Sequence, residues 1–91
     1  MYSFIFTNQF KKDFELLKKR NYDTMLLNKV FLHLQEIGTV PESYKPHKLQ
    51  GKFSKCLECH IKPDWLLIWK TDKRNSEIIL VRTGTHSDLF V

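Results

Sequence analysis

The sequence has 91 residues and a formal net charge of +5, with four histidines counted as neutral. A chain of this length supports one hydrophobic core, and 42% hydrophobic residues are enough to build it, so we expect residues 1–91 to form a single domain. The basic excess favours a partner that carries phosphates or carboxylates, such as RNA, DNA or an acidic protein. The longest apolar run is far shorter than the roughly 20 residues of a membrane-spanning helix, so no membrane association is expected.

The first strand and the first helix are predicted from the N-terminal stretch. Residues 2–7, YSFIFT, are β-branched and aromatic, which is typical of a strand. Thr7 or Asn8 can then cap a helix that runs to about Arg20. Its apolar residues recur at i, i+4 and i+7, which predicts one buried stripe.

A second helix is predicted after a short polar turn. Asp23 is a good N-cap residue, and Gly38 follows Ile37 as a natural stop. The turn between the two helices is short, so we expect them to lie antiparallel and to pack together on a sheet.

The second half of the chain predicts a loop followed by strands. Residues 39–55 contain two prolines and a glycine and are expected to be mostly loop, with at most a short strand near Leu49. Strand-like runs follow at 56–62, 64–71 and 77–83. The predicted fold is α+β, with two antiparallel helices packed on a small, mainly antiparallel sheet in the order β-α-α-β-β-β.

Cys56, Cys59 and His60 have the Cys-x-x-Cys-His spacing of a c-type haem attachment site. Side chains alternate along a strand, so Cys56 and His60 share one face and Cys59 lies on the other. The two thiols then cannot jointly hold a haem, a zinc ion or a disulfide. Two cysteines without an export signal indicate buried free thiols in a cytoplasmic protein, and we expect no cofactor and no metal.

A candidate site is predicted from His47, His60 and His86, with Asp64 and Arg82 near strand ends. Strand ends in a meander can converge on one edge of a sheet. Three histidines can bind zinc. They can equally cleave RNA without metal, one taking the proton of a ribose 2′-hydroxyl and another protonating the leaving 5′-oxygen, while a cation stabilises the phosphorane. The positive charge favours RNA, because lysines flank these histidines: Lys45, Lys48, Lys52, Lys55 and Lys62.

Three stretches, HKLQG (47–51), ECHIKPDWLLIWK (58–70) and RTGTHSDLF (82–90), resemble the YafQ-like toxins of the RelE/ParE superfamily, the toxin halves of bacterial toxin–antitoxin modules. The resemblance implies a microbial-RNase-like fold and a ribosome-dependent, metal-independent endonuclease. Such an enzyme cleaves mRNA through the ribose 2′-hydroxyl and stops translation and growth. The resemblance also implies a monomeric free toxin, an acidic antitoxin that masks its site, and binding of operator DNA only by the complex of the two.

The same resemblance assigns roles to individual residues. Asp64 and His86 are the main proton-transfer candidates, with His47 and His60 assisting or positioning the phosphate, and Arg82 stabilising charge. Phe90 either stacks on a base or only pins the C-terminal tail. Supporting or RNA-binding roles are expected for Glu58, Lys48, Lys52 and Lys62.

A function of another class stays open. The ParE branch of the superfamily has a similar layout and inhibits DNA gyrase by binding it. The histidine set favours the nuclease, because a gyrase binder has no chemical need for proton-transfer groups.

Overall fold

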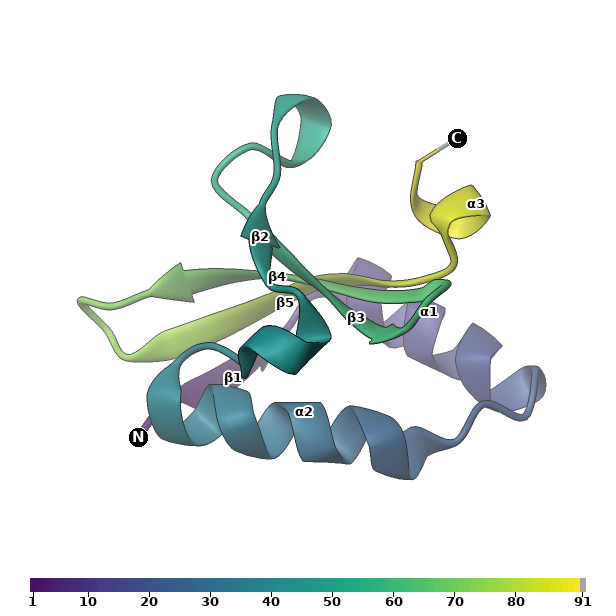
Figure 1. Cartoon of the computed structure of the whole chain (residues 1–91), viewed down its shortest axis with the longest axis horizontal. Helices are drawn as coiled ribbons and strands as arrows, with labels where there is room; N and C mark the ends of the chain where they lie inside the picture. Colours follow the sequence, from purple (N-terminus) through teal and green to yellow (C-terminus); the bar gives the residue numbers. More distant parts are fainter. Residues whose placement is uncertain (91) are drawn as a thin grey trace.

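A five-stranded sheet organises the computed structural model, which describes residues 1–90 (Figure 1). The strands lie in the order β1-β5-β4-β3-β2. β1 pairs with β5 in parallel, and every other neighbouring pair is antiparallel. The bounds are β1 (Ser3–Phe6), β2 (His47–Lys48), β3 (Leu57–Lys62), β4 (Trp65–Asp72) and β5 (Glu77–Gly84). The predicted α+β class and the mainly antiparallel sheet are therefore confirmed.

The two long helices cover one face of this sheet, and the short helical segments η2 and α3 stand on the opposite side (Figure 1). No helix in the described part of the chain is long and apolar enough to cross a membrane. The bounds are α1 (Asn8–Lys19), α2 (Thr24–Ile37), α3 (His86–Leu89), and the 3-10 turns η1 (Glu42–Tyr44) and η2 (Gly51–Phe53). One face of the sheet is thus closed by the long helices, and the opposite face, called the open face, is covered only in part by η2 and α3.

The helix ends follow the capping residues in the sequence. The Thr7 hydroxyl accepts a hydrogen bond from the Phe10 amide, and the Asp23 carboxylate accepts one from the Met25 amide. Gly38 ends α2 in the left-handed conformation, with φ of 74°, which a glycine adopts at little cost. The predicted starts of both helices and the predicted stop of the second are confirmed.

Buried side chains form two clusters on opposite faces of the sheet. Cys59 belongs to the cluster between sheet and helices, and Cys56 belongs to the smaller cluster on the other face. Both thiols are buried and free. Burial raises the pKa of Cys59 to about 12, so this thiol stays protonated near neutral pH. The prediction that the two cysteines point to opposite faces is confirmed.

Two short elements were not predicted as the structure has them. The strand expected near Leu49 lies at His47–Lys48, and its two residues are too few to show alternation in the sequence. No element was predicted after β5, where the structure has α3. A capping box starts this helix, with the Thr85 hydroxyl accepting from the Asp88 amide and the Asp88 carboxylate accepting from the Thr85 amide. Both elements carry a histidine of the candidate site.

Candidate active site

Asp64, in the turn between β3 and β4, holds His86 at the start of α3. Its Oδ1 accepts the His86 backbone N–H at 2.9 Å and lies 2.6 Å from His86 Nδ1. These two hydrogen bonds, the backbone one first, lower the pKa of Asp64, so the carboxylate is ionised near neutral pH. An ionised acceptor at Nδ1 favours the tautomer that carries its proton there, which leaves Nε2 of His86 outside the contact with Asp64.

Glu58 forms a second carboxylate–histidine group on β3. Its Oε1 lies 3.2 Å from His47 Nε2 and 3.9 Å from His60 Nε2. The residue is only 4% exposed, and no group among the described residues hydrogen-bonds to Oε2. Buried carboxylate oxygens are rarely left without a donor. Glu58 Oε2 is therefore a solvent-shielded acceptor without a donor among the described residues.

Backbone carbonyls orient the two histidines beside Glu58. His47 Nδ1 lies 2.9 Å from the Lys45 carbonyl oxygen, and His60 Nδ1 lies 3.3 Å from the Pro63 carbonyl oxygen. Each Nδ1 then donates to its carbonyl, so Nε2 of each ring is directed toward Glu58. His47 reaches this position because β2 pairs with β3 in a register that sets His47 opposite Glu58.

The three rings and Phe90 form a continuous row over the open face of the sheet. Ring centroids are 6.0 Å apart for His47 and His60, 6.0 Å for His60 and His86, and 6.4 Å for His86 and Phe90. Phe90 also packs edge-on against Phe53 and stays half exposed. The structure thus brings together four predicted site residues from β2, β3, α3 and the segment after α3.

Arg82 was expected beside these histidines, but its hydrogen bonds go to α1. Its Nε and Nη2 donate to the two Asp13 carboxylate oxygens at 2.7 and 3.0 Å. These hydrogen bonds to Asp13 raise the pKa of Arg82. Asp13 also accepts the Thr83 backbone N–H at 3.1 Å, so it fastens α1 to the edge of β5. Arg82 Nη1 takes no part in the contacts with Asp13.

Sequence reasoning missed Asp13, which is 7% exposed. Position 13 lies three residues after Phe10 and four before Leu17, within the buried stripe of α1. A carboxylate inside an apolar stripe indicates a buried partner, because an unpaired buried charge is costly. That signal was present in the sequence.

The predicted lysines lie at the rim of the site. Lys48, Lys52 and Lys62 are exposed. Lys62 and Lys45 line a pocket of about 320 Å³ that includes His60. Lys52 instead lies 5.5 Å from the centre of the Phe53 ring, in the loop before β3. Lys45 and Lys62 therefore share a pocket with His60. Lys52 lies beside Phe53, whose ring packs against Phe90.

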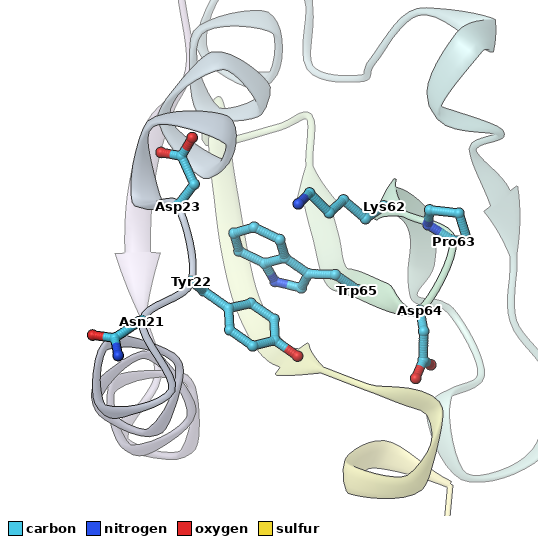
Figure 2. A pocket seen from close by; sticks show the side chains of 7 residues that line it. All are labelled: Asn21, Tyr22, Asp23, Lys62, Pro63, Asp64 and Trp65. Carbon is cyan, nitrogen blue, oxygen red and sulfur yellow. The ribbon is translucent and has the colours of Figure 1, made fainter.

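A larger pocket, of about 490 Å³, lies beside Asp64 (Figure 2). Tyr22 and Trp65 pack edge to face inside it, with ring centroids 4.9 Å apart. The Asp64 carboxylate points away from these rings, toward α3 (Figure 2). Trp65 is 2% exposed and its Nε1 donates to Thr83 Oγ1 at 3.0 Å, so it is a core residue. The lining residues are Asn21, Tyr22, Asp23, Lys62, Pro63, Asp64 and Trp65.

His47, Glu58 and His60 also form a possible metal-binding cluster. Their potential ligand atoms all lie within 4.8 Å of one another. Two imidazoles and a carboxylate suit zinc and other divalent transition metals. The sequence suggested a set of three histidines as the metal alternative. In the structure Glu58 is near enough to be the third ligand, and His86 is engaged by Asp64.

The mixed sheet, the two helices on one face and the histidine–carboxylate row on the other define a small α+β domain of RelE-like fold. Residues 2–91 match a family described as the bacterial toxin of type II toxin–antitoxin systems, YafQ. The chain belongs to this family, which confirms the family resemblance read from the three sequence motifs.

Individual relatives are similar over nearly their whole length. The mRNA interferase toxin YafQ of Escherichia coli K12 is 38% identical over 87 residues, covering 93% of this chain and 91% of the relative. Among solved structures, the E. coli DinJ–YafQ complex matches with a TM-score of 0.88 and 33% identity, covering 100% of both chains. A metal-bound toxin from Helicobacter pylori matches with a TM-score of 0.89 and 38% identity, covering 99% of this chain and 100% of that one.

Proposed function

We propose that this toxin is an mRNA interferase, an endoribonuclease that cuts mRNA on the ribosome and is restrained by a cognate antitoxin. The observation that carries the proposal is the row of three histidines, held by two separate carboxylates, on the open face of the sheet. The E. coli relative is an mRNA interferase, and a solved relative was obtained with its antitoxin DinJ. A net charge of +5 suits both an RNA substrate and an acidic antitoxin.

The first proton transfer is assigned to His60, which lies beside Glu58 in the row. His60 Nδ1 faces the Pro63 carbonyl, so Nε2 carries the lone pair and accepts the proton of the ribose 2′-hydroxyl. The 2′-oxygen then bonds to phosphorus. Glu58 stabilises the imidazolium that forms on His60, because its carboxylate lies 3.9 Å from that nitrogen.

The second proton transfer, to the leaving oxygen, is assigned to His86. Asp64 stabilises the protonated ring through Nδ1, so Nε2–H of His86 donates to the leaving 5′-oxygen as the phosphorus–oxygen bond breaks. The proton gained by His60 and the proton lost by His86 balance, and the product carries a 2′,3′-cyclic phosphate. No metal ion takes part in these steps.

Charge on the phosphorane is stabilised by cations at the rim. Lys62 borders the pocket that contains His60, and Arg82 keeps its Nη1 group outside the contact with Asp13. Phe90 stacks on one base at the end of the row, and the pocket beside Asp64 has room for a flanking nucleotide.

The proposal is tested by expressing the toxin without antitoxin and mapping cut sites in cellular mRNA. Wild type should halt growth and leave cut messages, whereas folded His86→Ala should do neither. A folded His86→Ala protein that remains fully toxic would contradict the assignment of His86. Toxicity with DNA damage and intact mRNA would instead support the gyrase-binding alternative.

A further inference from the structure

His86 belongs to α3, a helix too short to be stable by itself. α3 spans four residues, and the amides of Leu89 and Phe90 close its turn on the carbonyls of Thr85 and His86. A single helical turn has no stability of its own in water. The position of the His86 ring therefore depends on the contacts that fasten α3 to the rest of the protein.

One fastening is the capping box at Asp88. Its Oδ2 accepts the Thr85 backbone N–H at 2.9 Å, which folds the side chain back over the end of β5. Gly84 makes this approach possible, because a Cβ atom at this position would come 2.8 Å from Asp88 Oδ2. The box defines where α3 begins, but both of its partners lie within one local segment. It cannot fix α3 against the sheet.

Asp64 holds the first residue of α3 from the turn before β4. A third polar contact comes from Arg20, which caps the C-terminal end of α1. Arg20 Nη1 donates to Asp88 Oδ2 at 2.7 Å, and Nη2 donates to Oδ1 at 3.1 Å. The two parallel bonds define the direction of the carboxylate as well as its distance. The Arg20 bond is the largest cause of the lowered pKa of Asp88, so this carboxylate is ionised near neutral pH. Of the described contacts, this is the one that ties a charged side chain of α3 to a long helix.

We propose that Arg20 and Asp88 are positioning residues, whose two-point ion pair fixes α3 against α1 and so sets the His86 ring for proton transfer to the leaving oxygen. The inference rests on the proposed role of His86. General acid catalysis requires the donor within hydrogen-bond reach of its acceptor, and small misplacements lower the rate steeply. Neither residue needs to touch RNA.

Two other roles would give the same contact. The first is stability alone, but the Arg20 and Asp88 side chains are 37% and 22% exposed, and ion pairs at a surface add little. Leu89, 2% exposed, already anchors α3 in the smaller cluster. Alternatively Arg20 would bind an RNA phosphate directly, and Asp88 would then compete with the substrate for it. Each role predicts a different kinetic result.

The test compares Arg20→Gln with Lys19→Gln, which removes the same charge from the neighbouring exposed position of α1. Asp88→Asn removes the charge from the other partner and keeps an oxygen for the Thr85 amide. Steady-state cleavage of ribosome-bound mRNA gives kcat and KM for each variant, and hydrogen exchange at the Leu89 and Phe90 amides reports the order of α3. His86→Gln, measured beside them, tests the proposed function separately.

We expect kcat to fall about tenfold in both Arg20→Gln and Asp88→Asn, with KM unchanged and faster exchange in α3. The double variant should be no slower than either single one, because both remove the same coupling. Arg20→Lys should recover part of kcat, since an ammonium makes one contact where the guanidinium makes two.

Three results would overturn the inference. If kcat in Arg20→Gln equals that of Lys19→Gln while α3 exchanges faster, the pair is structural only. If Arg20→Gln raises KM and Asp88→Asn lowers it, Arg20 binds RNA. If Asp88→Asn is slow while Arg20→Gln is unaffected, the cap matters and the ion pair does not. Full activity of His86→Gln would contradict the proposed function instead, whatever Arg20 does.

Discussion

The two carboxylate–histidine groups of the site are built in opposite ways. Glu58 is buried in the sheet and meets its histidines at 3.2 and 3.9 Å, one of them on a paired strand and the other on its own strand. Asp64 is exposed in a turn, yet it binds the backbone and the ring of one residue, with the shorter contact at 2.6 Å. The sheet therefore fixes the Glu58 group, whereas the Asp64 group depends on a turn and a four-residue helix.

In the proposed mechanism, one proton transfer is therefore assigned to a group that the sheet fixes and the other to a group that a short helix carries. A group held by strand pairing keeps its geometry through the reaction, which suits the base that must find the 2′-hydroxyl. The His86 ring, at the start of a four-residue helix, can shift toward the leaving oxygen. The contacts that hold α3 are needed to keep that ring in one position. Substitutions of His86, Glu58 and Asp64 test the two groups separately.

The largest effect is expected for His86→Ala. Loss of a general acid lowers the rate about 10²- to 10⁴-fold, and we expect that fall in kcat for mRNA cleavage. Ser87→Ala is the matched control, because Ser87 is the exposed neighbour on the same helix. Equal rates for the two variants would remove His86 from the mechanism.

Glu58→Gln should lower kcat about 100-fold, because it removes the negative charge that stabilises protonated His60 in a poorly solvated position. The substitution keeps the shape of the side chain, so circular dichroism should be unchanged. The cleavage rate on a defined message measures the effect. A rate within a factor of about two of wild type would show that the buried carboxylate has no part in the chemistry.

Asp64→Asn should lower kcat less, about tenfold, because this carboxylate is solvent-exposed and its charge is screened. The amide oxygen can still accept the His86 backbone N–H, so α3 should stay in place. Hydrogen exchange at the Leu89 amide checks that point. A loss as large as that of His86→Ala would mean that the Asp64 charge is essential to the acid.

The lowered pKa of Asp64 also gives a pH dependence of stability. A carboxyl whose pKa is lower in the folded state stabilises the fold above its unfolded value and loses that contribution as pH falls through the folded value. Denaturation midpoints of wild type and Asp64→Asn should therefore converge on acidification below about pH 4, near the ordinary pKa of aspartate. A constant difference between the two curves down to pH 2 would contradict this.

The smallest effect is expected from metal removal. Cleavage after dialysis against EDTA should equal cleavage before it, because in the proposed mechanism His60 and His86 perform both proton transfers. The message and the ribosomes need magnesium for their own structure, so the chelator is removed before the assay. A rate that falls after EDTA and returns with zinc would instead assign His47, Glu58 and His60 to a catalytic metal.

The sequence predicted the regular elements because each carries its own local signal. Runs of aliphatic and aromatic residues marked the long strands, and Thr7, Asp23 and Gly38 marked helix ends. β2 and α3 carry too few residues for a period to appear, and both form through distant contacts. Alternation along residues 56–62 also puts Glu58 on the same face as His60.

The partners in the two long-range ion pairs could not be predicted from the sequence. Arg82 binds Asp13 across 69 positions of chain, and Arg20 binds Asp88 across 68. No local pattern encodes which of many basic and acidic residues will meet at such a separation. Only the buried position of Asp13 on its helix indicated that a partner existed.

Both of these ion pairs start from α1, and this has a consequence for how the toxin becomes toxic. Asp13 holds β5 and Arg20 holds α3, while β1 pairs in parallel with β5. The segment that carries His86 is therefore ordered by residues made long before it, and pairings over such separations form late in folding. A chain that is cut within α1 keeps the sequence of the site but loses the contacts by which Asp13 and Arg20 order β5 and α3. Toxicity is thus expected only from a chain whose first long helix has packed against its last strand.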